Sequence, residues 1–239
     1  MDYVGTELET FRLATTWKRY FAERLRPWLG RRVLEVGAGL GANTRSLFCD
    51  EVERWLAIEP DRQLAGQLTL ALAELADAPR CEARCCTLAD LDSGTEDEAS
   101  RELFDCVLYI DVLEHIEEDS AELARAATHL APGGRLVMLG PAHNALFSPF
   151  DAAVGHFRRY DRGNLPATPP ELTLKRVEYL DSVGVTLSAA NRLLLRSSAP
   201  TQGQIRFWDR VVVPISRLID PLLLRRLGKS ILAVWVRAG

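Results

Sequence analysis

Three glycines behind an acidic side chain are the first residues of this sequence whose spacing could support chemistry. They lie in the run Glu35-Val36-Gly37-Ala38-Gly39-Leu40-Gly41. Glycine lets a backbone turn sharply and approach a ligand closely, and a helix beginning after such a turn offers free N–H groups to an anion. A tight strand-to-helix turn also needs glycine for steric reasons alone, so the run by itself leaves both interpretations open.

A second acidic residue, Glu59, ends the next apolar run at residues 55–58. An acidic side chain at the tip of a neighbouring strand can accept hydrogen bonds from both hydroxyls of a ribose. The alternative is a surface carboxylate beside the helix start at Pro60-Asp61. Together, the glycine turn and Glu59 predict a site for an adenosine-containing cofactor.

Residues 141–165 hold a third group of reactive side chains. It comprises two histidines, one aspartate, two arginines and a tyrosine: His143, Asp151, His156, Arg158, Arg159 and Tyr160. Either histidine could take a proton from an acceptor hydroxyl or amine, because imidazole titrates near neutral pH. The arginine pair could clamp a phosphate or carboxylate. The alternative is a buried ionic network that only fixes this loop.

The elements that must position these groups follow from the hydrophobic periodicity. Short β-branched or apolar runs at 32–36, 55–59, 81–86, 105–110 and 135–139 alternate with helical patterns at 42–48, 61–76 and 120–130. Such alternation predicts crossover units, a parallel sheet and helices on both faces. Ligands of these sheets bind beyond the carboxyl ends of the strands, which is where the glycine run and Glu59 lie.

The spacing G-x-G-x-G with Glu35 two residues ahead resembles the first motif of the class I S-adenosylmethionine-dependent methyltransferases. Phe104–Ile116 is similar to the family's fourth-strand motif, and Leu130–Leu136 to its turn into the fifth strand. The resemblance covers roughly residues 10–140. It implies an α/β fold: a Rossmann-like seven-stranded, mainly parallel sheet with helices on both faces, an antiparallel last strand, an N-terminal helix and a C-terminal lid or cap.

The resemblance also implies S-adenosyl-L-methionine as cofactor and S-adenosyl-L-homocysteine as product. Glu35 would hold the amino group, Glu59 the ribose hydroxyls, and Trp17 would lie on a helix that closes over the cofactor. The adenine contact stays open between Thr87 and Asp90. The full expected cofactor site is Trp17, Glu35, Gly37, Gly39, Gly41, Asn43, Glu59, Pro60, Thr87, Leu88, Asp111 and Val112.

Residues 141–160 resemble a P-A-H…G-H-x-R-R-Y signature in a type 11/12-like subgroup of these enzymes. This implies metal-independent, in-line O- or N-methylation of a small-molecule, lipid or glycan-precursor acceptor. His143 and His156 are the expected catalytic residues, and Arg158, Arg159 and Tyr160 the expected substrate contacts. A non-catalytic S-adenosylmethionine-binding module is an alternative. A nicotinamide-dependent oxidoreductase is another, although its fingerprint would read G-x-G-x-x-G.

We expect one methyltransferase domain over residues 1–239. Its parts are a helical cap at 1–30, a cofactor-binding core at 31–140, an acceptor-site lid at 141–165, and the last strands at 166–239 with a helical insertion at 190–228.

Composition narrows the partners and the compartment. A net charge of −4 argues against a general nucleic-acid binder. Five cysteines without a C-x-x-C pair predict neither a disulfide framework nor a zinc knuckle. We expect a cytoplasmic protein, since neither a signal peptide nor an 18-residue apolar run is found.

The apolar, arginine-flanked stretch 206–226 could touch a membrane surface, cover a substrate pocket, form a dimer contact or cap the protein's own core. A monomer and a homodimer both stay open.

Overall fold

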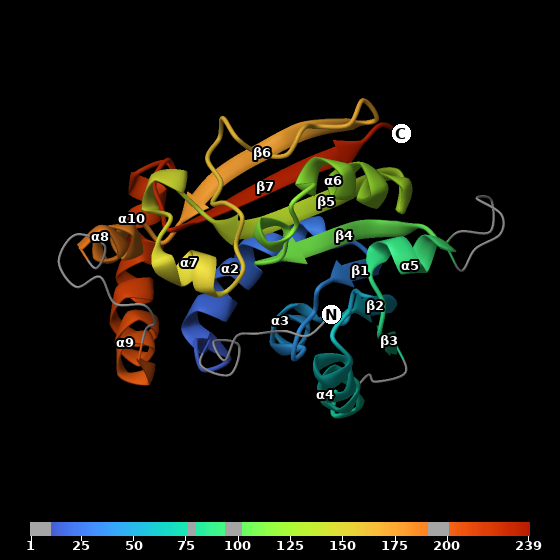
Figure 1. Ribbon diagram of the computed structural model, residues 1–239, viewed down its shortest axis with the longest axis horizontal. Coiled ribbons are helices and arrows are strands. Elements are labelled where there is room, and N and C mark those ends of the chain that lie inside the picture. The colour runs from blue at the N-terminus through green and yellow to red at the C-terminus, as the bar shows by residue number, and fades with distance from the viewer. Residues whose placement is uncertain (1–10, 76–79, 94–101, 191–200) are drawn as a thin grey trace.

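The structure is a computed structural model that describes residues 11–75, 80–93, 102–190 and 201–239. Its centre is a seven-stranded sheet in the order β3-β2-β1-β4-β5-β7-β6 (Figure 1). The strands are β1 Arg32–Val36, β2 Arg54–Ile58, β3 Cys81–Arg84, β4 Phe104–Ile110, β5 Leu130–Pro141, β6 Leu172–Leu180 and β7 Ser230–Arg237. The strands β1 to β5 pair in parallel, whereas β7 runs antiparallel to both β5 and β6. The predicted fold class is therefore confirmed.

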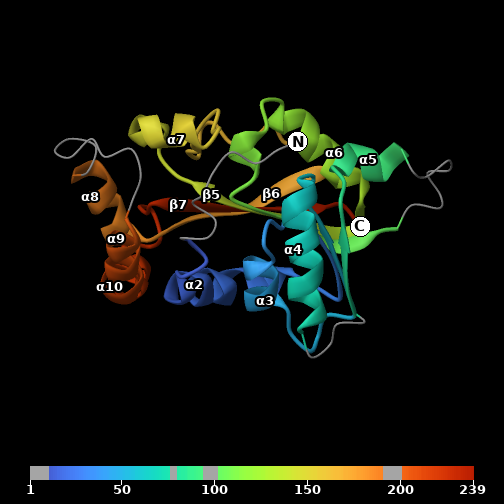
Figure 2. The same ribbon diagram turned by 60° about the horizontal axis from the view of Figure 1, so that its bottom comes forward.

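Helices cover both faces of the sheet (Figure 2). The helices α2, α3, α4 and α10 lie on one side, and α5, α6 and α7 lie on the other. The helix bounds are α2 Thr15–Leu25, α3 Ala42–Leu47, α4 Arg62–Ala73, α5 Leu88–Ser93, α6 Asp119–Thr128, α7 Pro149–Ala153, α8 Ser182–Ala190, α9 Gln202–Phe207 and α10 Val213–Leu222. Short helical turns are η1 Arg26–Trp28, η4 Leu113–His115, η5 Asn144–Leu146 and the π-helical η7 Trp208–Val212.

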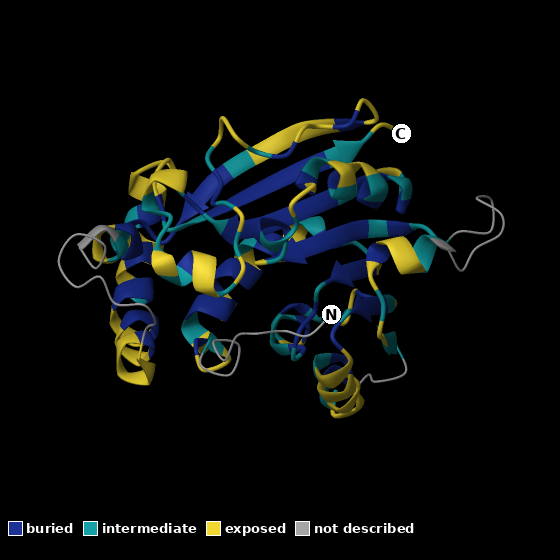
Figure 3. Ribbon diagram, viewed as in Figure 1, coloured by how far each residue is buried: buried dark blue, intermediate teal, exposed yellow. Residues whose placement is uncertain are grey.

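The central strands are buried on both faces, as the dark blue sheet in Figure 3 shows. All but the first residue of β1 is buried, and the same holds for β2. Strands covered on both sides need near-continuous apolar runs rather than alternation, and that is how these strands appear in the sequence. Two apolar cores result, one against α2 with Leu68 and Trp208, and one against α6 with Leu88 and Tyr160.

Some boundaries differ from the sequence-based expectation. The strand β5 begins at Leu130, not at 135, because Leu130 already pairs with Phe104 before a register shift. Gly134 permits this: a Cβ there would lie 2.7 Å from the carbonyl oxygen of Ala131. The strand β3 ends at Arg84, two residues early. Helix α8 begins at Ser182, ahead of the predicted insertion at 190–228, of which residues 191–200 lie outside the described part.

Buried aspartates fasten the insertion to the N-terminal helix. Asp209 of η7 accepts hydrogen bonds from the backbone N–H groups of Thr16 (3.2 Å) and Trp17 (2.8 Å) at the start of α2. Asp220 of α10 accepts one from the Tyr20 hydroxyl at 2.6 Å. Because the first turn of a helix has free donors, Asp209 supplies a cap from far along the chain. The insertion thus covers the protein's own core.

No described helix has both the length and the apolar character needed to cross a bilayer.

Candidate functional site

The loop between β1 and α3 takes its shape from its glycines. Gly37, Gly39 and Gly41 have φ angles of 69°, 55° and 74°, a region that side chains with a Cβ rarely adopt. A Cβ on Gly37 would lie 2.6 Å from Cγ2 of Val112, the second residue after β4. The loop therefore runs against the carboxyl end of β4, and this approach requires glycine at position 37.

Glu59 joins this loop to the end of β2. Its Oε2 accepts a hydrogen bond from the Gly39 N–H at 2.9 Å, and its Oε1 accepts one from the Asp61 N–H at 3.0 Å. The side chain is buried, and burial raises the pKa of its carboxyl group. A carboxylate offers about four lone-pair positions. Two bonds therefore leave Glu59 the capacity to accept the hydroxyls of a ribose, which fits the expected cofactor.

Glu35 instead faces the core on the α3 side. Its Oε2 accepts hydrogen bonds from the Thr44 hydroxyl (2.5 Å) and the Trp55 indole N–H (3.0 Å). Burial raises its pKa to about 7. Its Oε1 is buried and has no hydrogen-bond partner among the described residues. These contacts tie β1 to α3 and β2, and a bond from Glu35 to the amino group of a cofactor stays a prediction.

The remaining expected cofactor residues occupy three places. Thr87 and Asp90 hydrogen-bond each other across the start of α5, with Asp90 Oδ2 accepting from the Thr87 hydroxyl at 2.7 Å and the Asp90 N–H donating back at 3.1 Å. Leu88 is buried in the core on the α6 side. Asp111, exposed and with a φ of 53°, directly follows β4. Asn43 lies in α3, and Pro60 follows Glu59.

Trp17 lies in an aromatic cluster between α2 and the insertion. Its ring centroid is 5.7 Å from that of Trp208 and 5.6 Å from that of Phe21. Trp17 is 7% exposed. The cluster closes the α2 side of the molecule, and direct contact of Trp17 with a cofactor stays a prediction.

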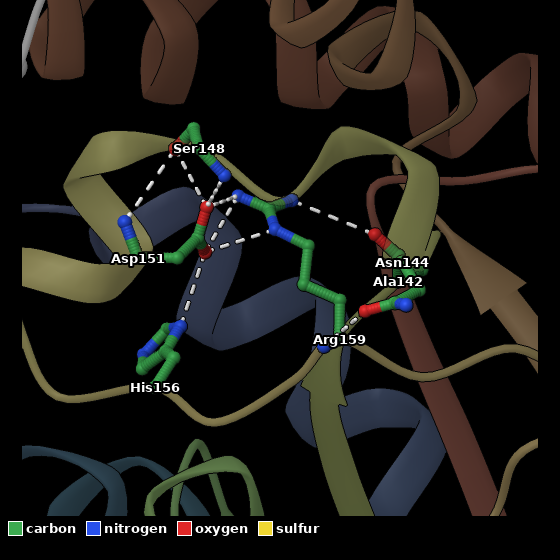
Figure 4. A network of polar contacts seen from close by, with 6 residues as sticks. All are labelled: Ala142, Asn144, Ser148, Asp151, His156 and Arg159. Atoms are coloured by element: carbon green, nitrogen blue, oxygen red, sulfur yellow. Dashed lines mark hydrogen bonds and ion pairs between the residues drawn. The ribbon is translucent and has the colours of Figure 1, made fainter.

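Asp151 is the centre of a polar network in residues 142–159 (Figure 4). It accepts two hydrogen bonds from Arg159, both at 2.9 Å, and one from the Ser148 backbone N–H at 2.8 Å. Nδ1 of His156 lies 3.0 Å from its Oδ1. Burial alone would raise the pKa of Asp151, but the bonds from His156 and Arg159 outweigh burial and hold the pKa well below its usual range. The ionic network considered as the alternative for this loop is therefore present.

The other expected substrate residues also have partners within the protein. The Arg158 guanidinium lies 2.6 Å from Asp119 Oδ2 and donates to the Glu117 carbonyl at 2.6 Å. The Tyr160 hydroxyl donates to the same Asp119 oxygen at 3.0 Å. Contacts of Arg158, Arg159 and Tyr160 with a substrate stay predictions.

The two candidate catalytic histidines lie in different surroundings. His143 stacks on Tyr179 of the edge strand β6, with 5.1 Å between ring centroids, and its Nδ1 is 3.2 Å from Asp161. The His156 ring instead meets His115 edge to face at 4.5 Å. Since His115 lies in η4, just after β4, the structure brings His156 to the carboxyl end of the central strands and places His143 toward the sheet edge.

Three residues near Asp111 were not expected from the sequence: Lys18, Glu114 and Lys229. Burial lowers the pKa of both lysines, and the Asp111 carboxylate partly opposes this. The Lys229 ammonium lies 4.4 Å from the centre of the Trp208 ring. A signal was available, because the chain has only three lysines and two of them lie here. Burial disfavours the charged form of an ionisable group. It strongly raises the pKa of the Glu114 carboxyl group and lowers the pKa of the His115 imidazole to about 4.

Comparisons with known proteins agree with this geometry. Residues 34–136 match a family model described as a methyltransferase domain. A ubiquinone biosynthesis O-methyltransferase from Bradyrhizobium diazoefficiens is 32% identical over 116 residues, which are 46% of this chain and 39% of that protein. The match therefore spans well under half of that relative's length.

Solved structures share the fold over most of the chain. The N-methyltransferase NodS from Bradyrhizobium japonicum WM9 has a TM-score of 0.57 at 16% identity, covering 95% of this chain and 97% of NodS. A geranyl diphosphate methyltransferase in complex with S-adenosylmethionine has a TM-score of 0.60 at 16% identity, covering 92% of this chain and 85% of that one. At such identities the likeness establishes the fold.

Proposed function

We propose that this chain, which has the class I S-adenosylmethionine-dependent methyltransferase fold, is an enzyme that methylates a small-molecule acceptor. The bond between the Gly39 N–H and Glu59 at the carboxyl ends of β1 and β2 carries the proposal. It holds a left-handed glycine turn and a buried carboxylate side by side, which is the arrangement that a ribose and a short polar tail need.

The residues divide into a cofactor side and an acceptor side. Glu59 would hold the ribose hydroxyls, and the glycine loop at residues 37–41 would line the methionine part. When bound, S-adenosylmethionine supplies a methyl group on a positively charged sulfur, so the protein needs no further activation of the leaving group. Orientation of the acceptor and exclusion of water then provide most of the rate enhancement. The Trp17–Trp208 contact is suited to excluding water.

On the acceptor side, we place His156 rather than His143 beside the reacting atoms. His156 lies against His115 after β4, and Asp151 orients its ring through Nδ1. Because Nδ1 faces Asp151, Nε2 is the atom that can accept the acceptor's proton. Arg158 and Arg159 would hold the lid through their ion pairs with Asp119 and Asp151.

We further propose that the acceptor is linked to a lipid and that the insertion docks on an anionic membrane surface. Leu218, Leu222 and Leu224 are 75%, 80% and 69% exposed, far more than core leucines. Exposed arginines lie along the same stretch of the chain at positions 206, 210, 217 and 226. An apolar helix face flanked by arginine suits the interface of a negatively charged bilayer.

We also propose a cytoplasmic location, because all five cysteines are unpaired.

Cofactor binding tests the function directly. We expect S-adenosylmethionine and S-adenosylhomocysteine to bind in isothermal titration calorimetry, and Glu59→Ala to weaken this by about 10–150-fold, from about 1.5–3 kcal/mol of lost charge-assisted bonds. Glu53→Ala is the matched control, since Glu53 lies just before β2, at the opposite end of the strand, and pairs with Arg31. A wild-type chain that binds neither compound refutes the function. Binding without formation of S-adenosylhomocysteine with any acceptor favours a non-catalytic module.

Vesicle sedimentation tests the docking surface. Phosphatidylglycerol vesicles should pull down the wild type, phosphatidylcholine vesicles should not, and Leu218→Asp with Leu222→Asp should abolish binding. Leu70→Asp on α4, which replaces an equally exposed leucine elsewhere, should bind normally. If the surface instead forms a dimer contact, the double variant will change the mass in light scattering without any vesicle binding by the wild type.

A further inference from the structure

Glu114, His115 and His156 each present one ligand atom, and these atoms all lie within 4.8 Å of one another. We propose that they form a binding site for a divalent transition-metal cation such as zinc, cobalt or iron(II). Two imidazole nitrogens and one carboxylate oxygen form a donor set that suits these ions, whereas calcium and magnesium prefer oxygen ligands alone.

The surroundings of Glu114 are the strongest support. The residue is 1% exposed, and neither of its carboxylate oxygens has a hydrogen-bond partner in any other described residue. The charges that act on it include the like charges of Asp111 and Asp151, opposed by Arg159. A buried polar group without a partner is costly and rare in folded proteins. A cation held between Glu114 and the two histidines would supply the missing partner.

His156 is held as metal-bound histidines usually are. The Nδ1 of His156 faces Asp151 at 3.0 Å, which leaves its Nε2 as the ligand atom. Arg159 and Ser148 in turn fix Asp151 (Figure 4). A carboxylate on the second nitrogen is the common support of a metal-bound histidine, since it sets the tautomer and the ring orientation. The Asp151 network thus gains a purpose beyond fixing the loop.

The position of the site suggests its role, and this part rests on the proposed function. The turn η4 follows β4 at the edge where the cofactor is expected. With Nε2 of His156 bound to the cation, that nitrogen no longer takes the proton itself. The cation would instead bind the oxygen of an acceptor hydroxyl and lower its pKa, so that its proton passes to water. A lone pair of that oxygen then forms the O–C bond while the C–S bond breaks and leaves its electron pair on sulfur. An alcohol and a sulfonium become a methyl ether, a thioether and one proton. The metal site therefore predicts O-methylation rather than N-methylation. It also predicts a transfer that depends on the metal, in place of the metal-independent transfer expected from the sequence.

Cobalt binding is the direct test on the full chain. After treatment with a chelator, the protein is titrated with Co²⁺ and followed by the visible absorption of the ion, with Zn²⁺ as competitor. We expect one equivalent per chain and at least a tenfold weaker affinity for Glu114→Gln and for His156→Ala. His143→Ala is the matched control, because His143 stacks on Tyr179 outside the cluster. Near-ultraviolet circular dichroism confirms that each variant is folded.

Three results would overturn the site: no stoichiometric uptake, unchanged uptake by Glu114→Gln and His156→Ala, or uptake lost in Cys85→Ser/Cys86→Ser. The last would place the ion on the neighbouring thiols, of which Cys85 is exposed. S-adenosylmethionine affinity, measured on the same samples, separates the two proposals. Cation binding without cofactor binding refutes the function alone, and cofactor binding without cation binding refutes the metal site alone.

Discussion

Replacing Asp151 by asparagine tests whether the buried network holds the lid. Asp151 and Arg159 form a two-bond ion pair, with both hydrogen bonds at 2.9 Å and the carboxylate 1% exposed. Asparagine has nearly the same shape, but it lacks the negative charge. The Arg159 guanidinium, 11% exposed, would then lie buried without its counter-charge.

The expected loss follows from that uncompensated charge. Removing one partner of a buried ion pair costs about 3–5 kcal/mol, which for a chain of this size lowers the melting temperature by roughly 6–20 °C. The pKa of Asp151 is depressed in the folded state, so its contribution is present above the unfolded-state pKa near 4 and is lost as the pH falls below that value. The difference between wild type and variant should therefore shrink in acid.

Urea denaturation followed by tryptophan fluorescence, from pH 7 down to pH 3, gives both quantities. Asp161→Asn is the control: Asp161 also bonds a histidine of the lid, but its side chain is 40% exposed, and we expect it to cost less than about 1 kcal/mol. Asp151→Leu combined with Arg159→Met should be less destabilised than Asp151→Asn. A loss below 1 kcal/mol for Asp151→Asn, or an equal loss for Asp161→Asn, would refute the reasoning.

Three further substitutions test the loop, the core carboxylate and the insertion. Gly37→Ala should weaken cofactor binding and cost at least about 1–2 kcal/mol of stability, because alanine is strained at a left-handed φ. Adding Val112→Ala should relieve the clash with the Val112 side chain but not the backbone strain. Normal cofactor binding by Gly37→Ala in calorimetry would contradict this. Glu35, with a folded-state pKa near 7, stabilises the fold below its unfolded-state pKa and loses this contribution, about 3 kcal/mol, as the pH rises through 7. Unfolding free energies at pH 5 and 8 should therefore differ less in Glu35→Gln than in wild type, and parallel profiles would argue otherwise. Gly184→Ala should disrupt α8, because its Cβ would lie 1.8 Å from an Asp181 oxygen, whereas Gly203→Ala in α9 meets nothing closer than 3.9 Å and should be neutral or stabilising in thermal melts.

The cofactor half of the molecule is readable from the sequence because its signals are local. A strand, a glycine turn and a helix follow one another in residues 32–47, so periodicity and spacing place Gly37, Gly39 and Gly41 directly. Glu59 follows for the same reason, as the residue that ends β2.

The acceptor half depends on contacts between distant segments, which no local pattern reports. His156 meets His115, which lies far earlier in the sequence, and the charges of Asp151 and Arg159 act on Glu114 only in the folded chain. The sequence showed both histidines of the lid as equals. Only the tertiary packing separates His143, stacked on β6, from His156 beside the end of β4.

The place of β7 in the sheet has a consequence for how the protein is made. The strand β7 follows β6 in the sequence but lies inside the sheet, between β5 and β6. During synthesis, β6 therefore emerges from the ribosome without a neighbour to pair with, and β5 presents an open edge until residues 230–237 follow. Unpaired edges are sites of wrong association. The sheet can therefore be completed only when residues 230–237 are available to pair with both β5 and β6.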